Sequence, residues 1–306
     1  MMDKTYIETV RLLLAVAPTI FREPDFAMKG GTAINLFVRD MPRLSVDIDV
    51  VYADHRAGRA DALKTISSGL DAARSRLIAM GYPCEVATGA GGDEIKVFIR
   101  RDRLRLKVEV NHVFRGTVLP VKMRSMSKMA QDTFKADLTA PVLHPSELYG
   151  SKLVAAMDRQ HPRDIFDVLG LYAEEGLTPE IVECFVCYLA GHNRPVHEVL
   201  FARPIDIGPA FQSEFVGMTR EPLTFDELLA VREKLFADLP LALTNNHRLF
   251  LLGLVSGEPD WSLMSCPHLP EMPAIRWKLE NLTKLKKSNP HKFSKQSGEL
   301  SARFGA

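Results

Sequence analysis

The chain has 306 residues, enough for one large domain or two modest ones. Its hydrophobic fraction of 46% and charged fraction of 25% are those of a folded globular protein, which excludes general disorder. The formal net charge is only +1, so any affinity for nucleic acid has to come from local clusters of basic residues.

Neither a targeting segment nor a membrane span is predicted. The N-terminus lacks the basic start and cleavage site of a signal peptide, and an amphipathic helix is expected over about residues 6–18. No uninterrupted apolar stretch reaches the roughly 18–20 residues that cross a bilayer. We therefore expect a cytoplasmic protein with no membrane partner.

The cysteines predict neither a zinc site nor a disulfide framework. Cys184 and Cys187 form a C-x-x-C pair inside an apolar run that predicts a buried helix, and no second pair completes a zinc site. Cys84 and Cys266 stand apart from that pair. This pattern fits a reducing compartment and a structural role.

The first half of the chain alternates predicted strands and helices. A short strand is expected at 26–29, then an apolar helix through Phe37, then a strictly alternating strand at 44–52. A polar helix follows at about 59–80 and ends before Gly81. Later strands are predicted at 94–100, 105–112 and, as one more candidate, 138–143.

Two glycines open the first apolar helix, in the segment Lys29-Gly30-Gly31-Thr32. Glycines let backbone N–H groups approach a phosphate, and a helix start adds partial positive charge. Thr32 can contribute a hydroxyl. The pattern is not a P-loop, because the lysine precedes the glycines, and such a segment is usually only a turn.

Asp47 and Asp49 stand at alternate positions of the strand at 44–52, so their side chains share one face. Ile48 and Val50 share the other. Two adjacent carboxylates repel each other, and a divalent cation such as Mg²⁺ relieves the repulsion. A solvated strand face gives the same pattern, so the pair alone is only a candidate metal site.

Glu109 lies on a second alternating strand, on the same face as Lys107 and Asn111. If that strand neighbours the first, Glu109 joins Asp47 and Asp49 in a cluster of three carboxylates. Such a set suits the two Mg²⁺ ions that clamp the attacking and leaving oxygens of a phosphoryl transfer. The alternative is a half-exposed strand with polar outer residues.

The second half of the chain is predicted to be mainly helical. One helix is expected to start at Pro145, with Ser146 as its N-cap, and to carry Lys152. Further helices are predicted after His161 through Leu171 and at 179–191, 225–239 (Thr224 as N-cap), 245–256 and 274–285, with a proline-rich loop at 259–273.

The order of these motifs resembles the nucleotidyltransferase superfamily related to DNA polymerase beta. There, a glycine turn precedes a D-x-D strand, and a third acidic residue lies on a later strand. The chain is most similar to the AbiEii/AbiGii toxin nucleotidyltransferases of type IV toxin–antitoxin and abortive-infection systems, whose patterns K-G-G-T-A-[IL], R-x-S-x-D-[IL]-D and K-[VI]-E-[VI] match 29–34, 43–49 and 107–110.

A fourth motif agrees with the same family. The run from Glu147 through Ala156 contains E-x-x-x-x-K-L-x-A, and Arg163 to Asp167 resembles R-D-[IL]-[YF]-D. In the family reading, Lys152 reaches the triphosphate as a cation. Asp164 or Asp167 positions Lys152 or an arginine, or assists the acceptor hydroxyl. Without the resemblance, all three read as solvated helix charges.

The resemblance implies an α+β fold: a polymerase-beta-like nucleotidyltransferase core with a mixed sheet and helices, followed by a mainly α-helical C-terminal region. We expect a catalytic domain at 1–140, a helical domain completing the active site at 141–287, and a flexible polar tail at 288–306.

The implied chemistry moves a nucleoside monophosphate from an NTP onto an acceptor, with Mg²⁺, or Mn²⁺ in its place, as the metal. Asp47, Asp49 and Glu109 are the expected metal ligands. The expected catalytic residues are those three with Lys152, Asp164 and Asp167, and the expected nucleotide-binding residues are Lys29, Gly30, Gly31, Thr32, Arg43, Ser45 and Lys152.

The family implies an RNA acceptor, in particular the 3′ end of tRNA, and a cognate antitoxin encoded nearby. Local basic clusters fit RNA, although each also reads as a solvated face. They lie at 100–105, 122–124 and 284–287, with Lys292 and Lys295 beyond them.

Three other interpretations compete. The same fold can adenylylate a small molecule or modify a protein hydroxyl. A nucleotide-binding or antitoxin-binding module with a dead site is disfavoured, because Asp47, Asp49 and Glu109 are all present. In the third interpretation, every motif is structural in an α+β interaction domain.

Overall fold

The structure is a computed structural model that describes residues 2–88 and 94–305. The chain divides into two compact units. Unit 1 comprises residues 1–148 together with the later segment 215–223, and unit 2 comprises 149–214 and 224–306. Within the described ranges, no helix is both long and apolar enough to cross a bilayer.

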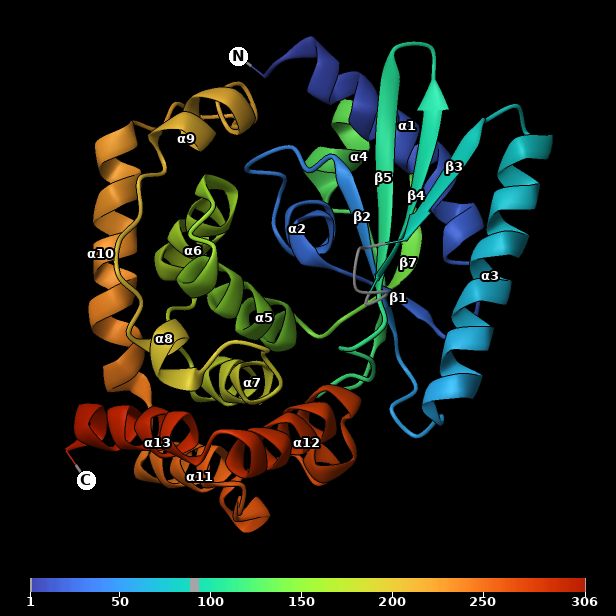
Figure 1. Cartoon of the computed structure of the whole chain (residues 1–306). Coiled ribbons are helices and arrows are strands. Elements are labelled where there is room, and N and C mark those ends of the chain that lie inside the picture. Colours follow the sequence, from blue (N-terminus) through green and yellow to red (C-terminus); the bar gives the residue numbers. More distant parts are fainter. Residues whose placement is uncertain (1, 89–93, 306) are drawn as a thin grey trace. The chain divides into compact units, whose positions relative to one another are not determined.

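Unit 1 is built on a seven-stranded sheet in the order β3-β4-β5-β2-β1-β7-β6 (Figure 1). The pairs β2–β5 and β1–β7 are parallel and the other neighbouring pairs are antiparallel, so the predicted mixed sheet is confirmed. The strands are β1 (Phe26–Lys29), β2 (Asp47–Tyr52), β3 (Cys84–Thr88), β4 (Glu94–Arg101), β5 (Leu104–Asn111), β6 (Lys122–Ser125) and β7 (Thr139–Val142).

Alternation along β2 and β5 fixes which side of the sheet is core. Ile48, Val50, Val108 and Val110 are fully buried, and the residues between them carry the polar side chains. Helix α1 (Lys4–Ile20), capped by Asp3, packs on these two strands. The remaining helices of unit 1 are α2 (Gly30–Ala33), which continues as a π-helical turn (Ile34–Val38), α3 (Arg59–Ala79) and α4 (Lys128–Phe134).

The later segment 215–223 completes unit 1. Backbone hydrogen bonds join Leu44 N to Met218 O at 2.8 Å and Arg220 N to Pro42 O at 3.0 Å. The side chain of Met218 is buried. The loop that leads into β2 is therefore held by residues from much later in the chain.

Unit 2 is helical, which confirms the predicted C-terminal region. Thr224 caps α10 as expected, in a reciprocal capping box with Glu227. Cys184 and Cys187 lie buried on α7, and none of the four cysteines forms a disulfide. The helices are α5 (Pro145–Asp158, which starts in unit 1), α6 (Pro162–Glu174), α7 (Pro179–Ala190), α8 (Val196–Leu200), α9 (Gly208–Glu214), α10 (Phe225–Ala242), α11 (Asn245–Ser256), α12 (Pro273–Ser288) and α13 (Pro290–Phe304).

Two local expectations differ from the structure. Ser146 lies inside the first turn of α5, because the helix already begins at Pro145. The flexible tail expected at 288–306 is largely helix α13 instead, which packs on α8, α11 and α12. Phe293 and Leu300 anchor it, seven residues apart and so on one helix face.

Candidate active site

A row of charged side chains crosses the polar face of the sheet in unit 1. Strand register pairs Lys29 of β1 with Asp49 of β2, Asp49 with Glu109 of β5, and Glu109 with Lys96 of β4. Directly paired residues share a face, so two carboxylates lie side by side between two lysines. Strands β2 and β5 are therefore neighbours, as the prediction of a three-carboxylate cluster required.

A second pair lies beside this row. Asp47 pairs with Lys107 in the same parallel register, and the Lys107 ammonium is 3.0 Å from the carboxylate of Glu109. Burial alone would lower the pKa of Lys107, but the charges of Asp47 and Glu109 outweigh it and raise that pKa. Lys107 therefore stays a cation among the carboxylates.

The surroundings of Asp49 disfavour the charged form of its carboxyl group. Burial raises its pKa, and the nearby charge of Asp47 raises it further, with Lys29 and Lys107 acting in the opposite sense. Carboxylate oxygens on one strand face, crowded by their own repulsion, are the donor chemistry that a hard divalent cation takes.

The three carboxylates are in register but do not converge on one point. Within residues 2–88 and 94–305, no three histidine, cysteine, aspartate or glutamate side chains are grouped closely enough to hold a metal ion. Glu109 points to Lys107, and Lys96 is 3.9 Å from the same carboxylate. Ligation of a metal by all three carboxylates remains a prediction. It requires Glu109 to give up its ion pair with Lys107 and to bind the metal in its place.

The glycine turn lies against the Asp49 carboxylate. Gly30 has a φ of +72°, and a Cβ built on it would lie 2.1 Å from Asp49 Oδ2. A Cβ on Gly31 would lie 2.7 Å from Arg43 Nη2 and 3.1 Å from Ser45 Oγ. The turn requires glycine at both positions, because a larger residue would collide with the side chains of Asp49, Arg43 or Ser45.

Thr32, Arg43 and Ser45 form the buried support of that turn. The Thr32 hydroxyl donates to the carbonyl oxygen of Asp47 and lies 3.0 Å from Ser45 Oγ. Arg43 is fully buried, and its Nη1 donates to the carbonyl of Leu44 at 2.9 Å. The Thr32 hydroxyl thus holds the start of β2 in position, and its predicted phosphate contact stays a prediction.

In unit 2, the fourth motif forms a buried ion cluster. The Lys152 ammonium on α5 lies 2.6 Å from Asp164 Oδ1 and 3.0 Å from Asp167 Oδ2, both on α6. Arg159 donates to Asp164 through Nε at 2.6 Å and Nη2 at 3.1 Å. The structure therefore brings together all three residues predicted from this motif and adds Arg159.

The cluster is electrically balanced. Burial would raise the pKa of Asp164, but Lys152 and Arg159 outweigh that effect and hold the pKa well below the usual range. The Lys152 side chain is only 6% exposed, whereas that of Arg159 is 63% exposed. Arg159 is thus the cation of this cluster that solvent and solutes reach.

Sequence reasoning did not assign Lys96 or Arg159. Lys96 enters the row only through the pairing of β4 with β5, which no local pattern reveals. Arg159 lies just after the end of α5, and its place between Lys152 and Asp164 in the fourth motif was an available signal.

Comparisons with known proteins agree with one another. A model of the family described as nucleotidyl transferase AbiEii toxin, type IV toxin–antitoxin system, matches residues 11–281. Among solved structures, the nucleotidyltransferase toxin MenT4 from Mycobacterium tuberculosis H37Rv is similar, with a TM-score of 0.59 and 19% identity over 90% of this chain and 91% of that one. At this identity the likeness shows the fold alone. No curated protein matches the chain.

Proposed function

The chain belongs to the AbiEii family of nucleotidyl transferase toxins of type IV toxin–antitoxin systems, and we propose that it transfers a nucleoside monophosphate to the 3′ end of RNA, in particular tRNA. Membership makes the chain a nucleotidyltransferase that uses an NTP and has an antitoxin as its counterpart. The acceptor, the metal and the residue roles below are our proposal.

The observation that carries the proposal is the row across the sheet. Asp49 and Glu109 are paired between two lysines, and Asp47 stands two residues before Asp49 on the same face. We assign Asp47, Asp49 and Glu109 as ligands of Mg²⁺ or Mn²⁺. The bound ion would polarise the phosphate oxygens and favour loss of the acceptor proton.

The glycine turn and its support orient the nucleotide. The close approach of Gly30 to the Asp49 carboxylate puts backbone N–H groups next to the metal ligands, where the phosphates of an NTP would lie. Lys29 adds a positive charge on the same face. Arg43, Ser45 and Thr32 keep the turn and the start of β2 fixed.

Lys152, Arg159, Asp164 and Asp167 form the buried ion cluster of the fourth motif. Asp164 and Asp167 both pair with the buried Lys152 ammonium, and a buried ammonium without such partners would be costly. Arg159 shares the Asp164 carboxylate and is largely exposed, so we assign to Arg159 and Lys152 the neutralisation of leaving-group charge.

The proposal is tested by incubating the purified protein with Mg²⁺, bulk tRNA and each α-³²P-labelled NTP in turn. Asp49→Asn keeps the size of the side chain but removes its charge, and Asp61→Asn on the exposed surface of α3 is the matched control. We expect labelled RNA from the wild type and from Asp61→Asn, and none from Asp49→Asn or in the presence of EDTA.

Other outcomes have defined meanings. Label absent from RNA, with Mg²⁺-dependent NTP binding intact, would exclude the RNA acceptor and favour a small-molecule or protein hydroxyl. Transfer that persists in EDTA, or in Asp49→Asn, would overturn the metal assignment.

A further inference from the structure

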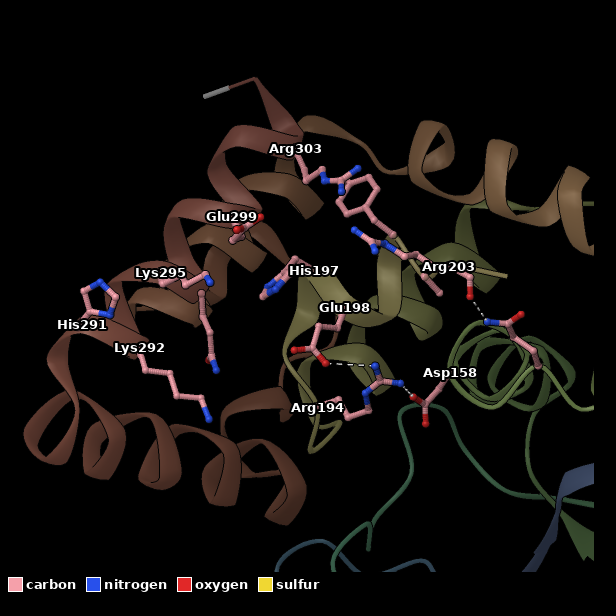
Figure 2. Close-up of a pocket in the computed structure, with 14 residues that line it drawn as sticks. Asp158, Arg194, His197, Glu198, Arg203, His291, Lys292, Lys295, Glu299 and Arg303 are labelled. Atoms are coloured by element: carbon pink, nitrogen blue, oxygen red, sulfur yellow. Dashed lines mark hydrogen bonds and ion pairs between the residues drawn. The ribbon is translucent and has the colours of Figure 1, made fainter. Parts of the chain in front are cut away.

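Unit 2 contains a pocket of about 740 Å³, a volume that suits a ligand of nucleotide size or larger. Its walls come from α8 and the segments on either side of it, from the end of α5, and from α13 (Figure 2). Helix α13 lies beyond residue 281, where the match to the family ends. The pocket thus depends on a part of this chain outside the matched region.

The lining is rich in cations. Five arginine and lysine side chains line the pocket against three carboxylates: Arg194, Arg203, Lys292, Lys295 and Arg303 against Asp158, Glu198 and Glu299. The surplus is a local feature, since residues 273–306 hold eight lysines and arginines against two glutamates in a chain of net charge +1.

Two of the three carboxylates, Asp158 and Glu198, already form ion pairs with Arg194. Arg194 lies 2.5 Å from Asp158 and 3.1 Å from Glu198, a contact that Figure 2 shows on one side of the pocket. In the part of the chain that the structure describes, the side chains of Arg203, Lys292 and Lys295 make no ion pair. Lys292 and Lys295 reach from α13 toward the side that Arg194 and Glu198 form.

An aromatic surface accompanies these cations. The guanidinium of Arg303 lies over the ring of Phe201, 5.4 Å from its centroid, and Phe201 meets Phe304 edge to face at 6.0 Å. Phe201 is half-buried at the pocket wall. Flat aromatic and guanidinium groups beside unpaired cations are the features by which proteins hold unpaired nucleotides.

The pocket is rigidly supported. The buried ammonium of Lys278 on α12 donates to the carbonyl oxygens of His192 at 2.9 Å and Arg194 at 2.7 Å. Leu300 and Phe293 anchor α13 on its other face. The backbone that carries these cations is therefore held in place before a ligand binds.

We infer that this pocket binds the phosphodiester backbone of unpaired RNA, and that it is a docking site for the acceptor RNA. The identification of the ligand as the acceptor rests on the proposed function. Cations spread over α13 and the segment after α8 match a run of several phosphates better than one inorganic phosphate, and the Phe201 surface favours nucleotides over an acidic peptide.

The test compares the full chain with Arg203→Gln/Lys292→Gln/Lys295→Gln. The control, Lys64→Gln/Lys128→Gln/Lys234→Gln, removes the same charge from exposed positions elsewhere. Fluorescence anisotropy with 5′-labelled bulk tRNA is measured over a range of KCl concentrations. Unlabelled tRNA and inorganic phosphate are added as competitors.

We expect the pocket variant to bind RNA on the order of tenfold more weakly at moderate salt. Its plot of log affinity against log salt should be shallower by about 2, because each lost phosphate contact on a single strand contributes roughly 0.7. The control should match the wild type. Both variants should keep the wild-type melting temperature, since the six substituted side chains are exposed.

Equal affinity and equal salt dependence in the pocket variant and the control would overturn the inference, as would a wild type that binds no RNA. Competition by inorganic phosphate as strong as that by RNA would assign the pocket to a single anion and would also overturn it. RNA binding through the pocket without transfer to that RNA would refute the proposed acceptor and leave the docking site standing.

Discussion

Gly30 and Gly81 share a left-handed backbone, but their surroundings differ. Their φ angles are +72° and +86°, and only at Gly30 would a Cβ collide with another residue, the Asp49 carboxylate. An alanine at either position costs roughly 1–2 kcal/mol for the backbone conformation. At Gly30 it must also displace a proposed metal ligand.

Gly30→Ala is therefore expected to abolish most nucleotidyl transfer, by about 100-fold if Asp49 moves by about 1 Å. Gly81→Ala should lose similar stability and keep its rate. Initial rates and thermal melts of the two variants check this. Equal rates would show that contact between the turn and Asp49 is not needed for catalysis.

Asp164 is expected to stabilise unit 2 through its ion pairs. Asp164→Asn should lower the free energy of unfolding by about 3 kcal/mol, because it removes the buried carboxylate that Lys152 and Arg159 share. Asp132→Asn, which removes an exposed pair with Lys128, should cost less than about 1 kcal/mol.

The pH dependence follows from the depressed pKa of Asp164. A carboxyl whose folded pKa lies below its unfolded value contributes stability above the unfolded value, here 3.8, and loses that contribution as the pH falls through the folded pKa. The cost of Asp164→Asn should therefore stay constant from neutral pH down to about pH 4. Urea unfolding at several pH values measures it, and a cost that already shrinks near pH 6 would contradict the depressed pKa.

Alternation along a strand made Asp47, Asp49 and Glu109 predictable, because it fixes the face of each side chain from local sequence. The partners of these carboxylates were not predictable in the same way. Lys96 reaches Glu109 only through strand pairing, and pairing is a long-range property. Glu109 was expected at a metal, and its contact with Lys107 depends on side-chain geometry that no pattern encodes.

Among the elements, the buried ones were predicted best. β1, β2, β4, β5 and β7 were expected within a few residues of their bounds, whereas β3 and β6 were missed. Both missed strands lie at the edges of the sheet. Val86 and Met123 are exposed there, so neither strand shows the apolar alternation that burial imposes.

Helix α13 was missed for a related reason: its apolar anchors are few. Leu300 is fully buried on it, whereas Leu241 near the end of α10 is 77% exposed. Leu300→Ala should therefore lower the free energy of unfolding by about 2–4 kcal/mol, through lost burial and a cavity. Leu241→Ala should change it by less than about 0.5 kcal/mol. Denaturant unfolding of both variants measures the difference, and similar small effects would mean that α13 is not packed.

For the molecule as a whole, the boundary between the two units was the feature predicted least well from the sequence. A linear catalytic domain at 1–140 was expected, but unit 1 extends to 148 and takes in 215–223. Glu147 explains the first difference, because its buried carboxylate accepts the backbone N–H groups of Val118 and Leu119 at 2.8 and 3.0 Å. The second arises from backbone pairing between residues far apart in the sequence, such as Leu44 with Met218.

Because residues 215–223 belong to unit 1, a fragment that lacks them should be less stable. Residues 1–148 alone lack the partners of Asp3 N, Leu44 N and the Pro42 carbonyl, and they lose the buried side chains of Phe215 and Met218. Each lost backbone hydrogen bond costs about 0.5–1.5 kcal/mol, and together with the lost burial of two side chains this is a large share of the 5–15 kcal/mol that stabilises a typical domain. We therefore expect 1–148 to show no cooperative thermal transition by circular dichroism.

Joining 215–223 to the C-terminus of this fragment through a flexible linker of roughly 20 residues should restore a cooperative transition. A scrambled 215–223 on the same linker is the control, because it keeps length and composition but cannot pair with the loop at 42–44. A sharp melt of 1–148 alone, unchanged by either addition, would mean that the later segment contributes little to unit 1.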